Sequence, residues 1–291
     1  MSSTQRLERR LTVGRELHSL VSTMKGLAAV GINDFERASE SIAAYAETVE
    51  LGLQVCFRDG DIPITDPRAG RAAAIIVGTD QGLCGPINRE VADEAVDWLE
   101  RHAPAPKHRL VAVIGRRAEA ALERRGVTGS HLPLPATVDG IPEVVQELVV
   151  RIDRWQADEN VSRVAVVFQH PLSRTRRVPR VFQVAPPDAA RLRRIAEEPW
   201  PTHRLPDSPH SFGVLLSGLL RADLFVALYR ALADARAAEH GARLTAMQAA
   251  ERSIEEQLDR LTTEYHQLRQ AEITAQILDV VSGYEAVSRR P

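Results

Sequence analysis

The sequence predicts an α/β domain of open, Rossmann-like architecture inserted between two long terminal helices that pair as an antiparallel coiled coil. Three observations predict this fold: the placement of proline, heptad-spaced apolar residues towards both ends, and short apolar runs in the middle. The expected parts are an N-terminal coiled-coil helix over 1–62, an inserted α/β domain over 63–208 and a C-terminal coiled-coil helix over 209–291. A chain of 291 residues can form about two domains with a hydrophobic core.

Proline is confined almost entirely to the middle of the chain. Sixteen of the 17 prolines lie between Pro63 and Pro209, and the other is Pro291. Proline in a helix interior removes a hydrogen bond and costs about 3 kcal/mol. Residues 1–62 and 210–290 can therefore form helices much longer than the average of about 11–12 residues.

The N-terminal segment has the 4,3 spacing of a coiled-coil seam. The expected seam carries no charge, and its small residues would let a second helix approach closely, which would offset a helix-propensity cost of about 1 kcal/mol per glycine. Its members are Leu17, Val21, Met24, Ala28, Gly31, Phe35, Ala38, Ile42, Tyr45, Val49, Gly52 and Cys56.

The C-terminal segment repeats this spacing and is expected to extend beyond the end of the N-terminal helix. The seam comprises Leu224, Leu228, Ala231, Ala235, Ala238, Leu244, Met247, Ile254, Leu258, Leu261, Tyr265 and Leu268. Glu251 interrupts it. The apolar spacing resumes in a shifted phase at Ile273, Ile277, Val280, Tyr284 and Val287. At about 1.5 Å per residue, roughly thirty residues of this helix would extend beyond its partner. Because an exposed apolar stripe promotes aggregation, we expect other subunits to supply a socket for this tip.

The middle of the chain alternates between strand and helix patterns. Short apolar runs predict buried parallel strands at 72–77, 110–114 and 164–168, and a further strand at 180–185. Helices are predicted at 88–101, 116–125 and 141–155. The basic turn at 173–179 carries Arg174, Arg176 and Arg177, which fit a charged hairpin tip better than a site for acidic lipid or phosphate.

The turn most like an active site is GTDQGLCGPIN, from Gly78 to Asn88, directly after the first predicted strand. Its glycine spacing matches neither nucleotide-binding pattern, and no lysine follows to reach a phosphate. Cys84 could be a nucleophile only with a base nearby, and no motif brings His102 or His108 to it. The histidines and cysteines form no metal-binding pattern. We therefore expect no catalytic residue, no metal and no cofactor.

Charge and cysteine content narrow the class of protein further. The 37 basic and 39 acidic residues are nearly balanced, which argues against a nucleic-acid partner. Two cysteines cannot form a disulfide framework, and the start MSSTQRLERR lacks the apolar region of a secretory signal, so a cytosolic location is expected. No run of about 18 consecutive apolar residues occurs, so we expect no direct membrane span.

Four separated motifs resemble the γ subunit of F-type ATP synthases. TDQGLCGPIN at 79–88 resembles S-D-R-G-L-C-G-G-x-N, and MKGLAAV at 24–30 is similar to K-A-M-K-M-V-A-A. EHGARLTAM at 239–247 resembles E-H-x-A-R-M-x-A-M. The tail RQAEIT at 269–274, with Ile277 and VVSG at 280–283, matches R-Q-A-x-I-T-x-E-I-x-E-I-V-x-G. The motifs occur in the family's order from end to end, so the chain is identified as a divergent bacterial member.

The resemblance implies a non-catalytic central-stalk rotor, which couples ion flow through a membrane sector to ATP synthesis or hydrolysis in a ring of three α and three β subunits. Implied partners are α and β in a 3:3:1 complex, the ε subunit and the c-ring, on the cytoplasmic face of the bacterial cell membrane, where the chain would be peripheral. The implied contacts with the ring are Met24, Lys25, Arg269, Gln270, Ile273, Thr274, Ile277 and Val280. The family-motif turn comprises Asp80, Gly82, Leu83, Cys84, Gly85 and Asn88.

Departures from the family pattern keep other interpretations open. Pro86 replaces the second glycine of G-G, Gln81 replaces arginine, and Lys25 is the one lysine left around the N-terminal motif. One alternative is a non-catalytic coiled-coil adaptor whose α/β domain binds a protein. The other is an α/β enzyme that uses Cys84.

Overall fold

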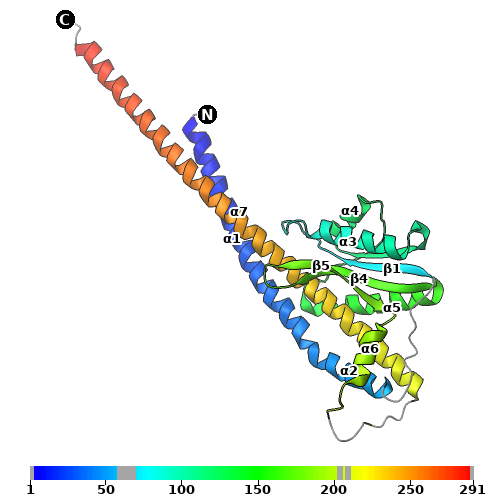
Figure 1. The fold of residues 1–291 in the computed structure, drawn as a ribbon. Coiled ribbons are helices and arrows are strands. Elements are labelled where there is room, and N and C mark those ends of the chain that lie inside the picture. Colours follow the sequence, from blue (N-terminus) through cyan, green and yellow to red (C-terminus); the bar gives the residue numbers. More distant parts are fainter. Residues whose placement is uncertain (1–2, 58–69, 202–205, 207–210, 289–291) are drawn as a thin grey trace. The chain divides into compact units, whose positions relative to one another are not determined.

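A computed structural model describes residues 3–57, 70–201, 206 and 211–288, with side-chain surroundings up to residue 281. It comprises two units, one of residues 1–27 with 245–291 and one of residues 28–244. Helices α1 (Ser3–Ser41) and α7 (Phe212–Ser288) contribute to both (Figure 1). The domain boundaries expected after residues 62 and 208 lie outside the described residues.

The first unit is an antiparallel pair of helical segments. Leu7, Leu11 and Val21 of α1 are buried, and Gly14 packs so closely on α7 that an added Cβ would lie 2.7 Å from Leu258 Cδ2. Half-buried residues of α7 form the other side of the interface, at Ile254, Leu258, Leu261, Tyr265 and Leu268, as the heptad spacing predicts. Proline-free sequence with this spacing explains why both segments are helical.

The second unit contains a five-stranded mixed sheet in the order β3-β2-β1-β4-β5. Its strands are β1 (Arg71–Val77), β2 (Arg109–Ile114), β3 (Ser130–Leu132), β4 (Val161–Pro171) and β5 (Arg177–Ala185). Strand β1 pairs in parallel with β2 and β4, β2 pairs in parallel with β3, and β5 runs antiparallel to β4 at the edge. The four predicted strands are confirmed. The three-residue β3 was not predicted, because it is too short to produce an apolar run.

Helices cover both faces of this sheet (Figure 1). On one face, α3 (Ile87–His102) and α4 (Arg116–Glu123) bury an apolar core that includes Trp98 and Leu122. On the other face, α5 (Ile141–Asp158) and the part of α7 around Leu228 bury a second core. The sheet is therefore buried on both sides, which explains its continuous apolar strands. Short 3₁₀ turns at Pro106–His108 and Val138–Gly140 precede β2 and α5.

The N-terminal helix is broken where one helix was expected. It ends at Ser41, turns at Ile42 and continues as α2 (Ala43–Phe57). The Ser41 hydroxyl donates a hydrogen bond to the Ala38 carbonyl at 2.9 Å, the kind of side-chain bond that bends helices. Helix α2 then packs with α6 (Ala189–Glu197), an element that was not predicted.

The predicted N-terminal seam is half correct. Its first heptad position is confirmed, since Val21, Ala28, Phe35, Val49 and Cys56 are all buried. The second position is mixed: Ala38 is buried and Gly31 and Gly52 pack closely on other side chains, whereas Leu17 and Tyr45 are 47% and 49% exposed. The adjacent positions also face inward, at His18, Lys25, Ile32, Ala46 and Leu53. Polar side chains occupy this neighbouring column because they have partners across the interface: His18 Nε2 lies 3.1 Å from Glu255, and Lys25 pairs with Glu251.

Helix α7 contains an 18-residue stretch that is apolar enough to cross a membrane by length and composition. Within the described structure, 22% of that stretch is buried. The expectation of no membrane span considered only unbroken apolar runs, and such a stretch also occurs in core helices. Several residues of α7 lie in the core of the second unit, including Leu228 and Leu232.

Candidate functional site

The candidate site predicted from the sequence has three parts: the N-terminal motif with Lys25, the tip of α7, and the turn after β1. The first two lie in the helix pair and the third lies in the α/β unit.

Lys25 makes a pair of bonds across the helix interface. Its ammonium group donates to both carboxylate oxygens of Glu251, at 2.7 and 2.6 Å. Glu251 is the residue that interrupts the predicted C-terminal seam. The interruption is therefore one half of an ion pair with Lys25 across the helix interface. Met24, its neighbour, is half-buried. Lys25 thus has a structural partner within the chain, and its predicted contact with a ring remains a prediction.

A cluster with the residue types of a cation site includes Glu251 and extends along both helices. Ligand atoms of His18, Glu251 and Glu255 lie within 4.8 Å of one another, and His18 Nε2 is 3.1 Å from Glu255 Oε1. Sequence motifs could not reveal this cluster because its members come from two helices. The Lys25 ammonium already neutralises the Glu251 carboxylate, and the Glu255 carboxylate lies against His18. Both carboxylates of the cluster therefore have partners within the protein.

Arg269 is connected to the N-terminal helix through Tyr265. The Tyr265 hydroxyl donates a hydrogen bond to Glu8 at 2.6 Å, and Arg269 donates to the Tyr265 oxygen at 3.3 Å. The bond to Glu8 raises the pKa of Tyr265. Thr4 contacts Glu272 by a hydrogen bond farther along α7. The pairing of the two helices therefore extends as far as Glu272, and the segment without a partner is shorter than the thirty residues expected.

Beyond this point the side chains of α7 are exposed. Every side chain from 271 to 281 is exposed, including Ile273 at 47%, Ile277 at 58% and Val280 at 73%. Leu278 and Val281 add to the same apolar surface, and Leu278 was not predicted. The Thr274 hydroxyl is occupied within the helix, where it donates to the Gln270 carbonyl at 2.8 Å. The tip presents apolar groups that this chain does not cover.

The turn after β1 is stabilised by its own hydrogen bonds. Thr79 N–H donates to Asn88 Oδ1 and Asn88 Nδ2 donates back to Thr79 Oγ1, both at 2.9 Å. Asp80 Oδ1 accepts from the backbone N–H of Arg116 at 2.9 Å, which connects the turn to the start of α4. Gly85 has φ of +68°, a conformation that glycine adopts without strain. These bonds give Asp80, Gly85 and Asn88 a structural role.

The turn also exposes one strained apolar residue. Leu83 has φ of +62° and is 62% exposed, while Gly82 beside it lies near Arg117. A positive φ is uncommon for leucine and costs free energy. No polar contact among the described residues explains this conformation, and Leu83 is the turn residue best placed for a partner.

Cys84 is buried and unsuited to nucleophilic attack. It is 2% exposed and packs with Ile87 and Ala242. Burial raises the pKa of its thiol, so the neutral form dominates at neutral pH. His102 hydrogen-bonds with the Trp98 carbonyl at 2.8 Å and stacks on the Trp98 ring, at the C-terminal end of α3, whereas the turn precedes the N-terminal end. The described geometry gives Cys84 no histidine base.

A buried charged network on α7 was not predicted as a site. Glu239 is 2% exposed and accepts from Arg243 Nη2 at 2.6 Å and from Arg236, which are 6% and 8% exposed. The Arg236 guanidinium lies 5.0 Å from the Phe35 ring centre, and His240 stacks on the same ring. The available sequence signal was the i, i+3 and i+7 spacing of Arg236, Glu239 and Arg243.

His240 is held in the neutral form by this network. Its pKa is lowered to about 4 by burial and by the positive charges of Arg236 and Arg243. The ring fills the space over Gly31, where an added Cβ would lie 2.6 Å from it. The predicted role of Gly31 in close helix approach is confirmed.

The hairpin between β4 and β5 is also tied to the helices of this unit. Arg174 donates to Asn33 of α1 at 2.8 Å, and Arg177 lies 3.7 Å from Glu90 of α3. Two of the three arginines in the predicted basic turn therefore have partners within the chain, as the interpretation of a charged hairpin requires.

Comparison with known proteins decides the family. A family model described as ATP synthase matches residues 3–287. The chain belongs to the ATP synthase family. It is 27% identical to the ATP synthase gamma chain of Geotalea daltonii, covering 99% of both proteins, and 28% identical to that of an Anaeromyxobacter strain, covering 99% of this chain and 100% of the relative.

The fold agrees with this membership of the ATP synthase family. A structure of the Euglena gracilis mitochondrial ATP synthase rotor superposes with a TM-score of 0.62 at 13% identity, covering 93% of this chain and 99% of that one. The predicted fold class and the predicted gamma-type central-stalk role are therefore confirmed. The individual contact residues named from the resemblance remain predictions.

Proposed function

We propose that this chain is the rotating shaft of an F-type ATP synthase and that it contains no catalytic site of its own. Its long helix pair turns inside a ring of three α and three β subunits. Since three identical catalytic subunits surround one asymmetric shaft, each orientation of the shaft favours a different conformation in each β subunit. Differential contact is sufficient for this coupling, so the shaft needs no chemistry.

The observation that carries the proposal is the exposed apolar surface of α7 from 271 to 281. Ile273, Ile277 and Val280 follow the Thr4–Glu272 hydrogen bond, which is the last one between the two helices within the described residues. Burying such side chains stabilises an assembly by about 25 cal/mol per Å² of apolar area. We assign these three residues to an apolar bearing formed by the ring.

Polar residues just below the bearing are assigned to the β subunits. Arg269 and Gln270 are exposed, and Arg269 is positioned by its bond to Tyr265. A guanidinium that is oriented in advance loses less conformational freedom when it meets a carboxylate. Thr274 completes this set, and Met24 with Lys25 contributes from α1. Leu83 and the rest of the turn after β1 are assigned to a partner of the α/β domain.

The remaining partners follow from the same function. We assign the ε subunit and the c-ring to the α/β domain and the foot of the shaft, on the cytoplasmic face of a bacterial cell membrane. The buried, neutral thiol of Cys84 supports a non-catalytic role. The three-part division at residues 62 and 208 separates shaft from foot in this proposal.

Co-expression tests the proposal. The chain is produced with α and β subunits from the same source, and the purified material is examined for a 3:3:1 complex whose ATPase activity depends on this chain. Deletion of residues 269–291 should weaken assembly or coupling, because it removes the bearing contacts. A truncated chain that assembles and couples normally would contradict the assignment of the tip. ATP turnover by the chain alone would contradict the non-catalytic role.

A further inference from the structure

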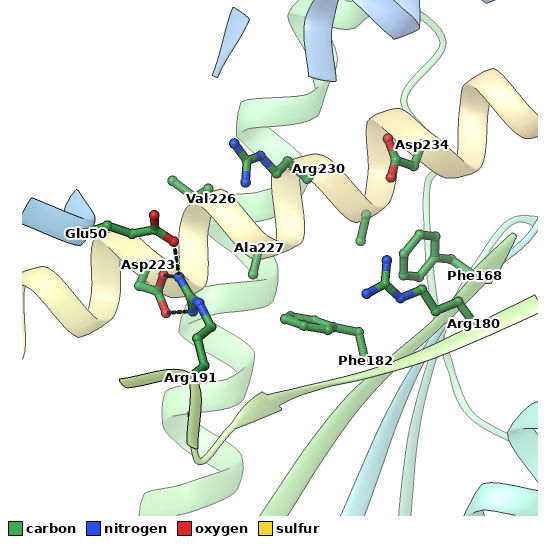
Figure 2. A pocket seen from close by; sticks show the side chains of 11 residues that line it. Glu50, Phe168, Arg180, Phe182, Arg191, Asp223, Val226, Ala227, Arg230 and Asp234 are labelled. Atoms are coloured by element: carbon green, nitrogen blue, oxygen red, sulfur yellow. Dashed lines mark hydrogen bonds and ion pairs between the residues drawn. The ribbon is translucent and has the colours of Figure 1, made fainter. Parts of the chain in front are cut away.

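A pocket of about 250 Å³ lies in the α/β unit, where β5, α6 and α7 line it. Figure 2 shows Arg180 and Phe182 of β5 on one side and Arg230 of α7 on the other. Val226, Ala227 and Ala231 supply apolar wall, and Arg191 of α6 closes one end. An adjoining hollow shares Arg180 and Phe182 and extends past Arg194.

The carboxylates of this pocket all have partners within the chain. Arg191 donates to both oxygens of Asp223, at 2.7 and 2.9 Å, and to Glu50 at 2.8 Å. Asp234 accepts from Ser39 at 2.9 Å and lies 3.0 Å from His170 Nδ1. These acidic groups are therefore neutralised or hydrogen-bonded before any ligand arrives.

In contrast to the carboxylates, several guanidinium groups of this region lack partners among the described residues. The Arg180 guanidinium lies 5.9 Å from the Phe182 ring centre, and the guanidinium groups of Arg180 and Arg230 form no hydrogen bond or ion pair with any residue that the structure describes. The guanidinium group of Arg194, in the adjoining hollow, has no such partner within the described ranges either. A concave site with satisfied carboxylates and unsatisfied guanidinium groups attracts anions, because arginine presents several donors that match phosphate and carboxylate oxygens.

We propose that this pocket binds an anionic group, phosphate or carboxylate, attached to a small apolar or aromatic body. Arg180 and Arg230 contact the anion, and the body covers Phe182 and the alanine wall of α7. The volume is slightly below the range of about 300–1,000 Å³ typical of ligand pockets, which favours a compact ligand. The same chemistry can come from a free small molecule or from an acidic side chain of a neighbouring subunit.

Ligand-observed NMR on the purified full chain tests the site with three probes: phenyl phosphate, inorganic phosphate and phenol. Phenyl phosphate should bind saturably and more tightly than inorganic phosphate, and phenol should not bind. Arg180→Gln and Arg230→Gln should each weaken phenyl phosphate binding by about tenfold or more, the loss expected when a hydrogen bond to a charged group is removed. Arg154→Gln, at an exposed position on α5, is the matched control.

The same titration on the assembled complex identifies the source of the anion. Binding retained in the complex supports a free small molecule, whereas binding lost there and present in the isolated chain supports an acidic side chain of a partner. Failure of phenyl phosphate to bind the isolated chain would overturn the proposal, as would equal binding by Arg180→Gln and Arg154→Gln. Melting curves establish that each variant is folded. The titrations on the isolated chain do not depend on whether the chain acts as a rotor.

Discussion

Two stretches of helix α7 contain similar apolar side chains in opposite surroundings. From Val226 to Met247 most side chains are buried, and the stretch includes Leu228 at 1% exposure. From 271 to 281 every side chain is exposed, although Ile273, Ile277 and Val280 are equally apolar. The first stretch is covered by this chain, and the second is available to other chains.

This difference separates stability from assembly within one helix. Substitutions in the buried stretch should change the free energy of unfolding of the isolated chain. Substitutions in the exposed stretch should leave that free energy nearly unchanged and act only when partners are present. Substitutions in the two stretches should therefore range from a large effect on the stability of the isolated chain to almost none.

Removing the central carboxylate of the buried network should have the largest effect. Glu239→Ala leaves the buried guanidinium groups of Arg236 and Arg243 without their counterion. Breaking a buried ion pair in this way costs about 3–5 kcal/mol. Urea denaturation followed by circular dichroism would measure the loss. Glu256→Ala, at an exposed position on the same helix, should change the free energy of unfolding by less than about 0.5 kcal/mol. Equal effects of the two substitutions would contradict the structural role of the network.

A pair of glycine substitutions should have opposite effects. Gly26→Ala meets no atom within 4 Å and should stabilise the helix by up to about 1 kcal/mol through helix propensity. Gly31→Ala places a methyl group 2.6 Å from the His240 ring, which is packed on Phe35 and cannot move freely. Overpacking of this kind costs about 1–3 kcal/mol. Thermal denaturation of the two variants would compare them directly, and stabilisation by Gly31→Ala would show that the approach at His240 is loose.

Acid should destabilise the chain through His240. The pKa of His240 is about 4 in the folded chain and 6.5 ordinarily. Between these pH values the imidazole is therefore protonated in the unfolded chain and neutral in the folded chain. The stabilising contribution is therefore complete above pH 6.5 and is lost as the pH falls towards 4. Urea midpoints of the wild type and of His240→Gln, measured across this range, should converge as the pH falls. A constant difference between them would contradict a depressed pKa.

Substitutions at the tip should have the smallest effect on the isolated chain. Ile277→Ser and Val280→Ser replace side chains that are already 58% and 73% exposed, so little buried area is lost. The free energy of unfolding should change by less than about 0.5 kcal/mol. A larger change in urea denaturation would mean that the tip is covered within this chain.

Proline placement and heptad spacing were sufficient to predict the two long helices, and apolar runs were sufficient for four strands of the sheet. Local sequence patterns did not predict which residues face the interface where this depends on a side chain from a distant part of the chain. Lys25 could not be placed on the seam until Glu251 was found opposite it. Ile42 could not be identified as a break, because proline and glycine are absent there.

The candidate site was predictable to a smaller extent. An apolar overhang on α7 follows from unequal helix lengths, but its start at Glu272 depends on a bond to Thr4. The neutral state of His240 depends on Phe35, Arg236 and Arg243 together. The arginine pocket draws its lining from helices and strands far apart in the sequence, so no local motif could reveal it.

The most direct measurement of the central claim is the ATPase activity of reconstituted complexes with a polar tip. A chain carrying Ile273→Ser, Ile277→Ser and Val280→Ser is compared with one carrying Val150→Ser, an exposed apolar position on α5. We expect the triple variant to fold normally and to lose either assembly with α and β or the ATPase activity that depends on this chain. Assembly and activity equal to those of Val150→Ser would contradict the claim that the exposed tip of α7 runs in an apolar bearing.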